Sequence, residues 1–240
     1  GAQVTPEQAD QLLIQDSVIG PRIKERVAKG RKATGHTHEL DTLEYLQTAK
    51  DEVYGEAINP RTQREYTLAD ISYDMMYAGG FQEGSEIYLH RPGEERYLDL
   101  VQNGQHFPIA VPSTRHPATI VHETIHLYGS DAWKNLLARP GNEGATEFFT
   151  RHLLSKQENP GVEDGATVFK RDSYPQEFEA TQCLVKKSSI ELLADAYFLG
   201  KIEPLRQKVG AANFDAWVAA MKVKNFNAAH AALGCAPPKG

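Results

Sequence analysis

Residues 121–129 read VHETIHLYG, in which two histidines lie four positions apart and a glutamate directly follows the first. On an α-helix, residues i and i+4 project from the same face, one turn apart. His122 and His126 can therefore turn their imidazole nitrogens toward one metal ion, at about 2 Å. Glu123 lies roughly 100° further around the helix, on the side where a water would bind. The pattern predicts a metal-binding helix.

The surrounding residues predict where this helix begins and ends. Ser113 and Thr114 are candidate caps, Pro117 suits an early helical position, and Gly129 is a natural stop. A second helix is expected from Ser130-Asp131 to just before Pro140-Gly141. A third is expected from Asn142 toward Lys156.

The third ligand is expected from this third helix. A catalytic zinc site has three protein ligands and leaves the fourth position for water. Glu143 and Glu147 both lie in the stretch from Pro140 to Leu153, with sixteen and twenty residues between them and His126. Spacing alone leaves the two glutamates as alternatives.

The combination of H-E-x-x-H with Asn142-Glu143-Gly144 and Phe148-Phe149 resembles the gluzincin metallopeptidases. The resemblance implies one catalytic zinc ion held by His122, His126 and Glu143. It implies that Glu123 is the base that takes a proton from the zinc-bound water, so that the chain hydrolyses peptide bonds. Glu147, one turn beyond Glu143, would then support a ligand histidine rather than bind zinc.

A looser resemblance extends from about Ile87 to Leu205. The stretches EGATEFFTR and LADAYFLG are similar to metallopeptidase domains of bacterial polymorphic and secretion-system toxins. This resemblance implies a polypeptide substrate and a chain that is secreted or delivered into a target cell. Endopeptidase activity is preferred over exopeptidase activity, but the sequence leaves both open. A cytoplasmic location of the chain remains an alternative. Two other functions also stay open: a binding module that zinc merely staples, and a hydrolase of cell-wall peptides.

The residue that would stabilise the oxyanion of the reaction is not fixed by spacing. Gluzincins often use a tyrosine or histidine downstream of the third ligand. The four candidates are Tyr174, Tyr197, His152 and Arg151. Tyr174 is the best placed of them, because it stands directly before Pro175 at the expected start of a helix.

The fold class expected is α+β and zincin-like. It has a small, mostly antiparallel sheet with an edge strand over the active-site helix, and a largely helical C-terminal half. Alternating polar and apolar residues predict strands at Ile87–His90, Tyr97–Val101 and Phe107–Val111. Ile87–His90 is expected to be the edge strand that pairs with an extended substrate. Helices are predicted over Leu40–Val53, Pro175–Lys187 and Ser189–Leu199.

The zincin-like domain is expected to cover residues 39–240. Residues 1–38 are predicted to form a helical and basic extension or linker before it, with short helices broken at Gly20-Pro21. The basic segment 22–32, RIKERVAKGRK, is interpreted first as a solvated linker. The alternative is a docking patch for an acidic partner.

Composition narrows the classes of function. The chain has 240 residues and a formal net charge of −6, which argues against a nucleic-acid partner. No apolar run is long enough to span a membrane. Cys183 and Cys235 are interpreted as a buried helix thiol and a tail thiol, with a single disulfide as the alternative. His36 and His38 alternate as strand or loop residues; metal binding is the alternative, although no second cluster of metal ligands lies beside them.

Overall fold

The structure, a computed structural model, describes residues 4–28, 36–91, 97–102, 104–111, 118–155 and 173–239. The predicted caps Ser113 and Thr114, Pro117, and the end of the basic segment lie outside these ranges. The described residues have an α+β fold that is mostly helical, as the sequence predicts.

The chain divides into two compact units. The first is Gly1–Pro6 with Thr34–Leu127, and the second is Glu7–Ala33 with Tyr128–Gly240. This division differs from the predicted boundary between residues 38 and 39, because residues 7–33 belong to the same unit as the C-terminal helices.

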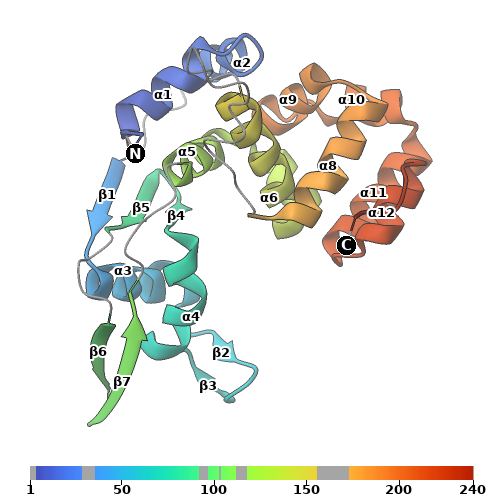
Figure 1. Cartoon of the computed structure of the whole chain (residues 1–240). Helices are drawn as coiled ribbons and strands as arrows, with labels where there is room; N and C mark the ends of the chain where they lie inside the picture. The colour runs from blue at the N-terminus through green and yellow to red at the C-terminus, as the bar shows by residue number, and fades with distance from the viewer. Residues whose placement is uncertain are drawn as a thin grey trace. The chain divides into compact units, whose positions relative to one another are not determined.

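The first unit contains all the strands of the described chain (Figure 1). In chain order its elements are β1 (His36–Leu40), α3 (Thr42–Ala49), the π-helical turn η1 (Lys50–Tyr54), β2 (Ile58–Asn59), β3 (Arg64–Glu65), α4 (Leu68–Ala78), β4 (Gly80–Glu83), β5 (Glu86–His90), β6 (Tyr97–Gln102), β7 (Gln105–Ala110) and α5 (Thr119–Tyr128). The predicted strands therefore exist as β5, β6 and β7, but the strands of the described chain form three small sheets in place of one. The pairs β2–β3 and β6–β7 are separate antiparallel hairpins.

The largest sheet has the strand order β1-β5-β4. Strand β5 is parallel to β1 and antiparallel to β4. The prediction that Ile87–His90 is an edge strand is therefore wrong. The reason is that β1, which begins inside the predicted N-terminal extension, occupies the side of β5 that was expected to be open. In this sheet the edges are β1 and β4.

The two faces of the sheet contact different helices, because successive side chains of a strand alternate between faces. On one face, the ring of Tyr45 in α3 lies 5.5 Å from that of Phe81 and 5.3 Å from that of His90. On the other face, a Cβ placed on Gly80 of β4 would lie 3.2 Å from Cγ2 of Thr119, the first residue of α5. The start of α5 is thus packed directly against strand β4.

Local signals in the sequence account for both ends of helix α4. Thr67 and Asp70 form a reciprocal capping box at its start. The hydrogen bond from the Thr67 backbone holds the pKa of Asp70 below its usual value. Gly79 ends the helix with a left-handed backbone, φ 72°, which glycine adopts without strain.

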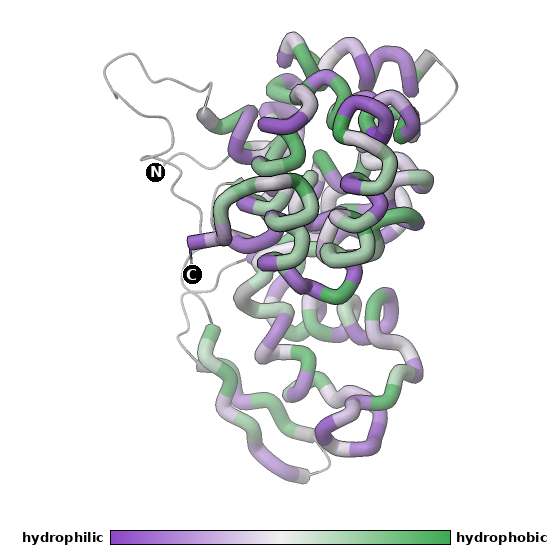
Figure 2. The backbone as a smooth tube through the Cα atoms, turned by 90° about the vertical axis from the view of Figure 1, so that its right-hand side faces the viewer, coloured by the Kyte–Doolittle hydropathy of each residue, from purple (hydrophilic) through white to green (hydrophobic). Residues whose placement is uncertain are grey.

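The second unit is built from helices. They are α1 (Pro6–Gln15), α2 (Ile19–Ala28), α6 (Asp131–Ser155), α8 (Pro175–Lys187), α9 (Ile190–Leu199), α10 (Ile202–Val209), α11 (Ala211–Lys222) and α12 (Phe226–Ala232). Figure 2 shows hydrophobic and hydrophilic segments alternating along these helices, as expected where one face of each helix is buried. The largest fully buried side chains of this unit are Trp133, Trp217, Tyr197, Phe149, Phe198 and Phe214.

The break between α1 and α2 falls at residues 16–18, before the predicted break at Gly20-Pro21. Asp16 caps α2, since its Oδ2 accepts hydrogen bonds from the backbone N–H groups of Val18, at 3.0 Å, and Ile19, at 2.8 Å. Pro21 lies in the first turn of α2, where a missing N–H is not needed for helical hydrogen bonding. The Gly20-Pro21 pair therefore marks a helix start, and the prediction placed the break a few residues late.

The described part of the basic segment belongs to α2 and contacts its own unit. The guanidinium Nε of Arg22 lies 2.9 Å from Oδ1 of Asp195, and Arg26 is buried. Glu25 pairs with Lys201 at 3.6 Å. Of the cations in this segment, Arg22 is thus directed toward α9 and Arg26 is buried, and the acidic partner stays a prediction.

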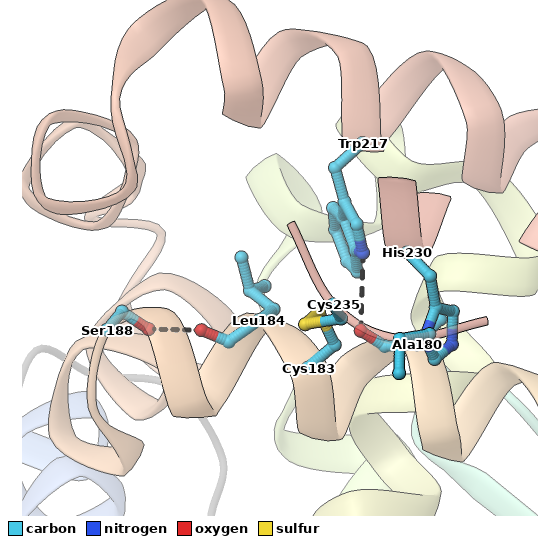
Figure 3. The surroundings of a disulfide bond; sticks show 8 residues. Ala180, Cys183, Leu184, Ser188, Trp217, His230 and Cys235 are labelled. Carbon is cyan, nitrogen blue, oxygen red and sulfur yellow. Dashed lines mark hydrogen bonds between the residues drawn. A yellow bond between two sulfur atoms is a disulfide. The ribbon is translucent and has the colours of Figure 1, made fainter. Parts of the chain in front are cut away.

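Cys183 and Cys235 form a disulfide, so the preferred prediction of two free thiols is wrong (Figure 3). Cys183 is buried on α8, where the indole of Trp217 donates to the carbonyl of Ala180. After α12 the tail turns back, and the backbone N–H of Cys235 donates to the carbonyl of His230 at 2.9 Å. The pairing depends on this return of the tail, which a separation of 52 residues does not reveal.

Replacing both cysteines by alanine is expected to lower the free energy of unfolding. In the chain-entropy treatment, a disulfide that closes a loop of this length raises the free energy of the unfolded chain by about 4 kcal/mol, because it restricts the conformations of that chain. Denaturant unfolding of the double variant Cys183→Ala/Cys235→Ala measures the loss, and the native chain in a reductant is the matched control. Equal unfolding midpoints for the native chain with and without reductant would contradict the disulfide.

Candidate metal centre

Helix α5 is buried along most of its length. The apolar side chains of Val121 and Ile125 are fully buried, and His122, Glu123 and His126 are only 2%, 7% and 7% exposed. The first turn is closed by the backbone N–H of His122, which donates to the carbonyl of Ala118 at 2.9 Å. Burial of polar groups is unfavourable unless other groups form hydrogen bonds or ion pairs with them. The buried polar side chains of α5 therefore require such partners.

The two histidines of α5 lie side by side, as their i, i+4 spacing predicts. Their ring centroids are 4.7 Å apart and the ring planes are nearly perpendicular, at 78°. Neither ring therefore stacks flat on the other, and the edges that carry the nitrogens remain suited to a common partner.

Helix α6 changes direction before it reaches Glu143. Ala138 has a non-helical backbone, with φ 54° and ψ −163°, and Pro140 and Gly141 follow it. A Cβ on Gly141 would clash with the side chain of Leu137, so the chain folds back closely here. The sequence predicts this break before Pro140-Gly141. Glu143 then lies near the start of the second helical stretch, where the helix dipole favours a carboxylate.

A nitrogen of His122, a nitrogen of His126 and a carboxylate oxygen of Glu143 all lie within 4.8 Å of one another. Two imidazoles and one carboxylate are a donor set that zinc accepts, and bonds of about 2 Å to a shared ion require donors this close. Among the described residues, the group has no fourth histidine, cysteine or acidic member. Three protein ligands leave one position of a tetrahedral ion for another molecule.

Glu147, the alternative third ligand, is not part of this group. Its side chain is fully buried, and its Oε1 accepts a hydrogen bond from Nε of Arg151 at 3.0 Å. The geometry therefore favours Glu143 as the third donor. Glu147 pairs with a cation one turn further along α6.

Close packing on α8 fixes the part of α6 that carries Glu143. A Cβ on Gly144 would lie 2.5 Å from Oγ1 of Thr181 and 2.7 Å from the carbonyl oxygen of Glu177. The absent side chain at Gly144 thus allows the backbones of α6 and α8 to approach, immediately beside the candidate ligand.

The four candidates for oxyanion stabilisation have different surroundings. Tyr197 is fully buried, and its hydroxyl lies 2.6 Å from Oγ1 of Thr146. Nε2 of His152 lies 3.1 Å from Oδ1 of Asp16, the residue that caps α2. Both contacts tie helices of the second unit together, and sequence separations of 51 and 136 residues gave no sign of them. Arg151 pairs with Glu147, and Tyr174 is partly exposed before α8.

His38 has its own partners within β1 and β5. Its Nε2 lies 2.7 Å from a carboxylate oxygen of Glu86, and its ring stacks on that of Tyr88 at 5.1 Å. These contacts account for His38 without a metal ion.

Comparisons of the chain with family models, curated proteins and solved structures gave no match. No helix in the described part of the chain is long and apolar enough to cross a membrane.

Gly144→Ala is expected to destabilise the protein. In an ordinary helix interior, alanine is more favourable than glycine by about 0.5–1 kcal/mol. Here the added Cβ meets the backbone of α8, and overpacking of this kind costs about 1–3 kcal/mol. A fall in the free energy of unfolding, measured with denaturant, is the expected result. A gain in stability would show that α6 and α8 are not so closely packed.

Measured zinc affinities of variants should show which of the two glutamates, Glu143 or Glu147, is the third ligand. Glu143→Gln removes a ligand carboxylate, so it should weaken zinc binding by at least the 10- to 100-fold typical of lost outer-shell partners. Glu147→Gln should bind zinc with less loss, since that carboxylate lies outside the donor group. Competition against a chromophoric chelator measures both variants. The reverse order of affinities would identify Glu147 as the ligand.

Proposed function

We propose that the chain is a zinc-dependent peptidase, an endopeptidase rather than an exopeptidase. His122, His126 and Glu143 would hold one catalytic zinc ion, with Glu123 as the base. The observation that supports this best is the group of three donors, two imidazoles and a carboxylate, with the buried Glu123 beside His122 on α5.

Each element of the reaction has a counterpart in these residues. A bound zinc ion supplies a Lewis acid, which polarises the scissile carbonyl and lowers the pKa of water toward about 7. The Glu123 carboxylate accepts the proton of the attacking water and passes it to the leaving amine nitrogen. The low exposure of Glu123 strengthens these charge interactions, because little bulk water screens them.

In this proposal an extended substrate pairs with β4 in place of the interior strand β5. Strand β4 is an edge of its sheet, and its Gly80 contacts the first residue of α5, one turn before His122. Backbone N–H and C=O groups at a sheet edge accept an added strand through main-chain hydrogen bonds. Such pairing recognises a polypeptide backbone with little dependence on its sequence.

The disulfide supports a location outside the reducing cytoplasm. Disulfides persist in secreted proteins and are rare where thiol reductants act. We therefore propose that the chain is secreted or delivered into a target cell, as the toxin-like resemblance implies.

The alternatives differ from this proposal in ways that can be observed. A binding module that zinc staples would require a fourth protein ligand, which the donor group does not have among the described residues. A hydrolase of cell-wall peptides would use the same residues on a different substrate. Incubation with unfolded protein and with purified peptidoglycan distinguishes the two substrate classes.

Glu123→Gln should abolish most cleavage while the chain still binds one zinc ion. Loss of a general base costs about 10²- to 10⁴-fold in rate. The test is release of new amino termini from an unfolded protein, with metal content measured on the same samples. Glu52→Gln, an exposed glutamate outside the donor group, is the matched control. Equal rates for the Glu123→Gln variant and the native chain would refute the assignment of Glu123 as base.

A further inference from the structure

Tyr197, near the end of α9, is a fully buried residue of the second unit. Its hydroxyl oxygen lies 2.6 Å from Oγ1 of Thr146, a residue of α6 that is also fully buried. This Oγ1 in turn lies 2.8 Å from the carbonyl oxygen of Asn142. A carbonyl can only accept, and a threonine hydroxyl has one proton. Thr146 therefore donates to Asn142, and Tyr197 donates to Thr146.

These two hydrogen bonds, the hydroxyl relay, end beside the candidate ligand. The carbonyl of Asn142 belongs to the peptide bond that joins it to Glu143. Glu143 supplies the carboxylate oxygen of the donor group. The relay therefore restrains the backbone from which that carboxylate projects, although Tyr197 and Thr146 are 51 residues apart in the sequence.

The same end of α9 also holds the segment that follows α5. The backbone N–H of Ser130 donates to the carbonyl of Tyr197 at 2.6 Å, and its Oγ donates to the carbonyl of Ala196 at 3.1 Å. A Cβ on Gly129 would lie 3.1 Å from the Tyr197 hydroxyl oxygen, so the phenol is close to this backbone. Gly129 is three residues after His126, another member of the donor group. Tyr197 thus contacts both the segment that leaves α5 and the helix that carries the third donor.

Stability alone does not require the two hydroxyl groups. The Tyr197 ring lies among aromatic side chains, 5.5 Å from the ring of Phe149 and 4.8 Å from that of Phe198. Removing hydroxyl groups from water is unfavourable, and the hydrogen bonds of the relay only offset that cost. Phenylalanine and valine would fill the same space with nearly equal stability. The hydroxyl groups add a contact of fixed length and direction between α9 and α6.

We propose that Tyr197 is a positioning residue. Through Thr146 it holds the backbone of Glu143 at the distance from the end of α5 at which the three donors can share one metal ion. The proposal rests on the metal centre of the proposed function. It assigns Tyr197 no contact with a substrate, because the hydroxyl proton is directed to Thr146.

Zinc affinity and stability should respond differently when both hydroxyl groups are removed. In the double variant Tyr197→Phe/Thr146→Val, the unfolding midpoint of the metal-free chain should stay within about 4 °C of the native value, because partners of the same shape replace both hydroxyl groups. Zinc affinity should fall about tenfold, the lower end of the loss typical when support behind a metal ligand is removed. Thermal unfolding and competition against a chromophoric chelator measure the two quantities on the full chain.

Single variants test whether the two hydroxyl groups act as one relay. Tyr197→Phe alone should lower zinc affinity as much as the double variant, because coupled residues are not additive. Thr146→Ser keeps a hydroxyl group, so its zinc affinity should stay within about twofold of the native value. Tyr45→Phe is the matched control, since Tyr45 is fully buried in the first unit and its hydroxyl donates to the carbonyl of Met75 at 2.9 Å. This control loses an equivalent hydrogen bond and should keep native zinc affinity.

Cobalt(II) bound in place of zinc reports the arrangement of the donors through its visible absorption, because the geometry of the ligands determines the bands. The bands should shift or weaken in Tyr197→Phe and stay unchanged in Tyr45→Phe. A change of stability alone would not alter the spectrum of the folded, metal-bound chain.

Native zinc affinity in the double variant would overturn the positioning role. So would a loss of affinity that appears equally in Tyr45→Phe, or only together with a large fall in the unfolding midpoint, since either pattern indicates a purely structural effect. If the native chain binds zinc and Tyr197→Phe binds it equally well, the positioning role alone fails. If the native chain binds neither zinc nor cobalt, the metal centre of the proposed function fails, and the role of Tyr197 is overturned with it.

Discussion

The burial of ionisable side chains on helix α5 is the constraint on which the rest of the structure depends. His122, Glu123 and His126 have little contact with bulk water, and a buried charge or an unpaired imidazole is costly. A fold that keeps them there must supply partners for them. The carboxylate of Glu143 is one such partner, within 4.8 Å of both imidazole donors, and a cation shared by the three would satisfy them together.

The second unit holds Glu143 by contacts that are far apart in sequence. The kink at Ala138 redirects α6, Gly144 lets α6 approach α8, and the hydroxyl groups of Thr146 and Tyr197 meet in the buried interior. The N-terminal helices contribute to the same unit, since Asp16 caps α2 and also contacts His152 of α6. Helix α6 is therefore fixed at its start, its middle and its end. A ligand carried by a loop would lack this restraint.

The prediction of the sheet shows where sequence patterns are incomplete. The alternation in Ile87–His90 predicts a strand, and β5 is that strand. The same alternation contains no information on which strands flank it, because pairing partners are chosen by tertiary packing. Strands β1 and β4 flank β5 and remove it from the edge, and β4, an edge strand among the described residues, lies beside the start of α5. The disulfide is a similar case, since its two cysteines meet only because the tail returns to α8.

Local chemistry could be predicted from the sequence because it depends on residues within one or two helical turns. The two histidines of α5, the break before Pro140-Gly141 and the helices over residues 175–199 are of this kind, and backbone geometry alone relates their side chains. The tertiary structure was required for every choice between distant partners. It selected Glu143 over Glu147 as the nearby carboxylate, and it paired Arg151 with both Glu147 and Ser173. It also placed residues 7–28 among the C-terminal helices. These choices follow from close packing between elements that the chain brings together only when it folds.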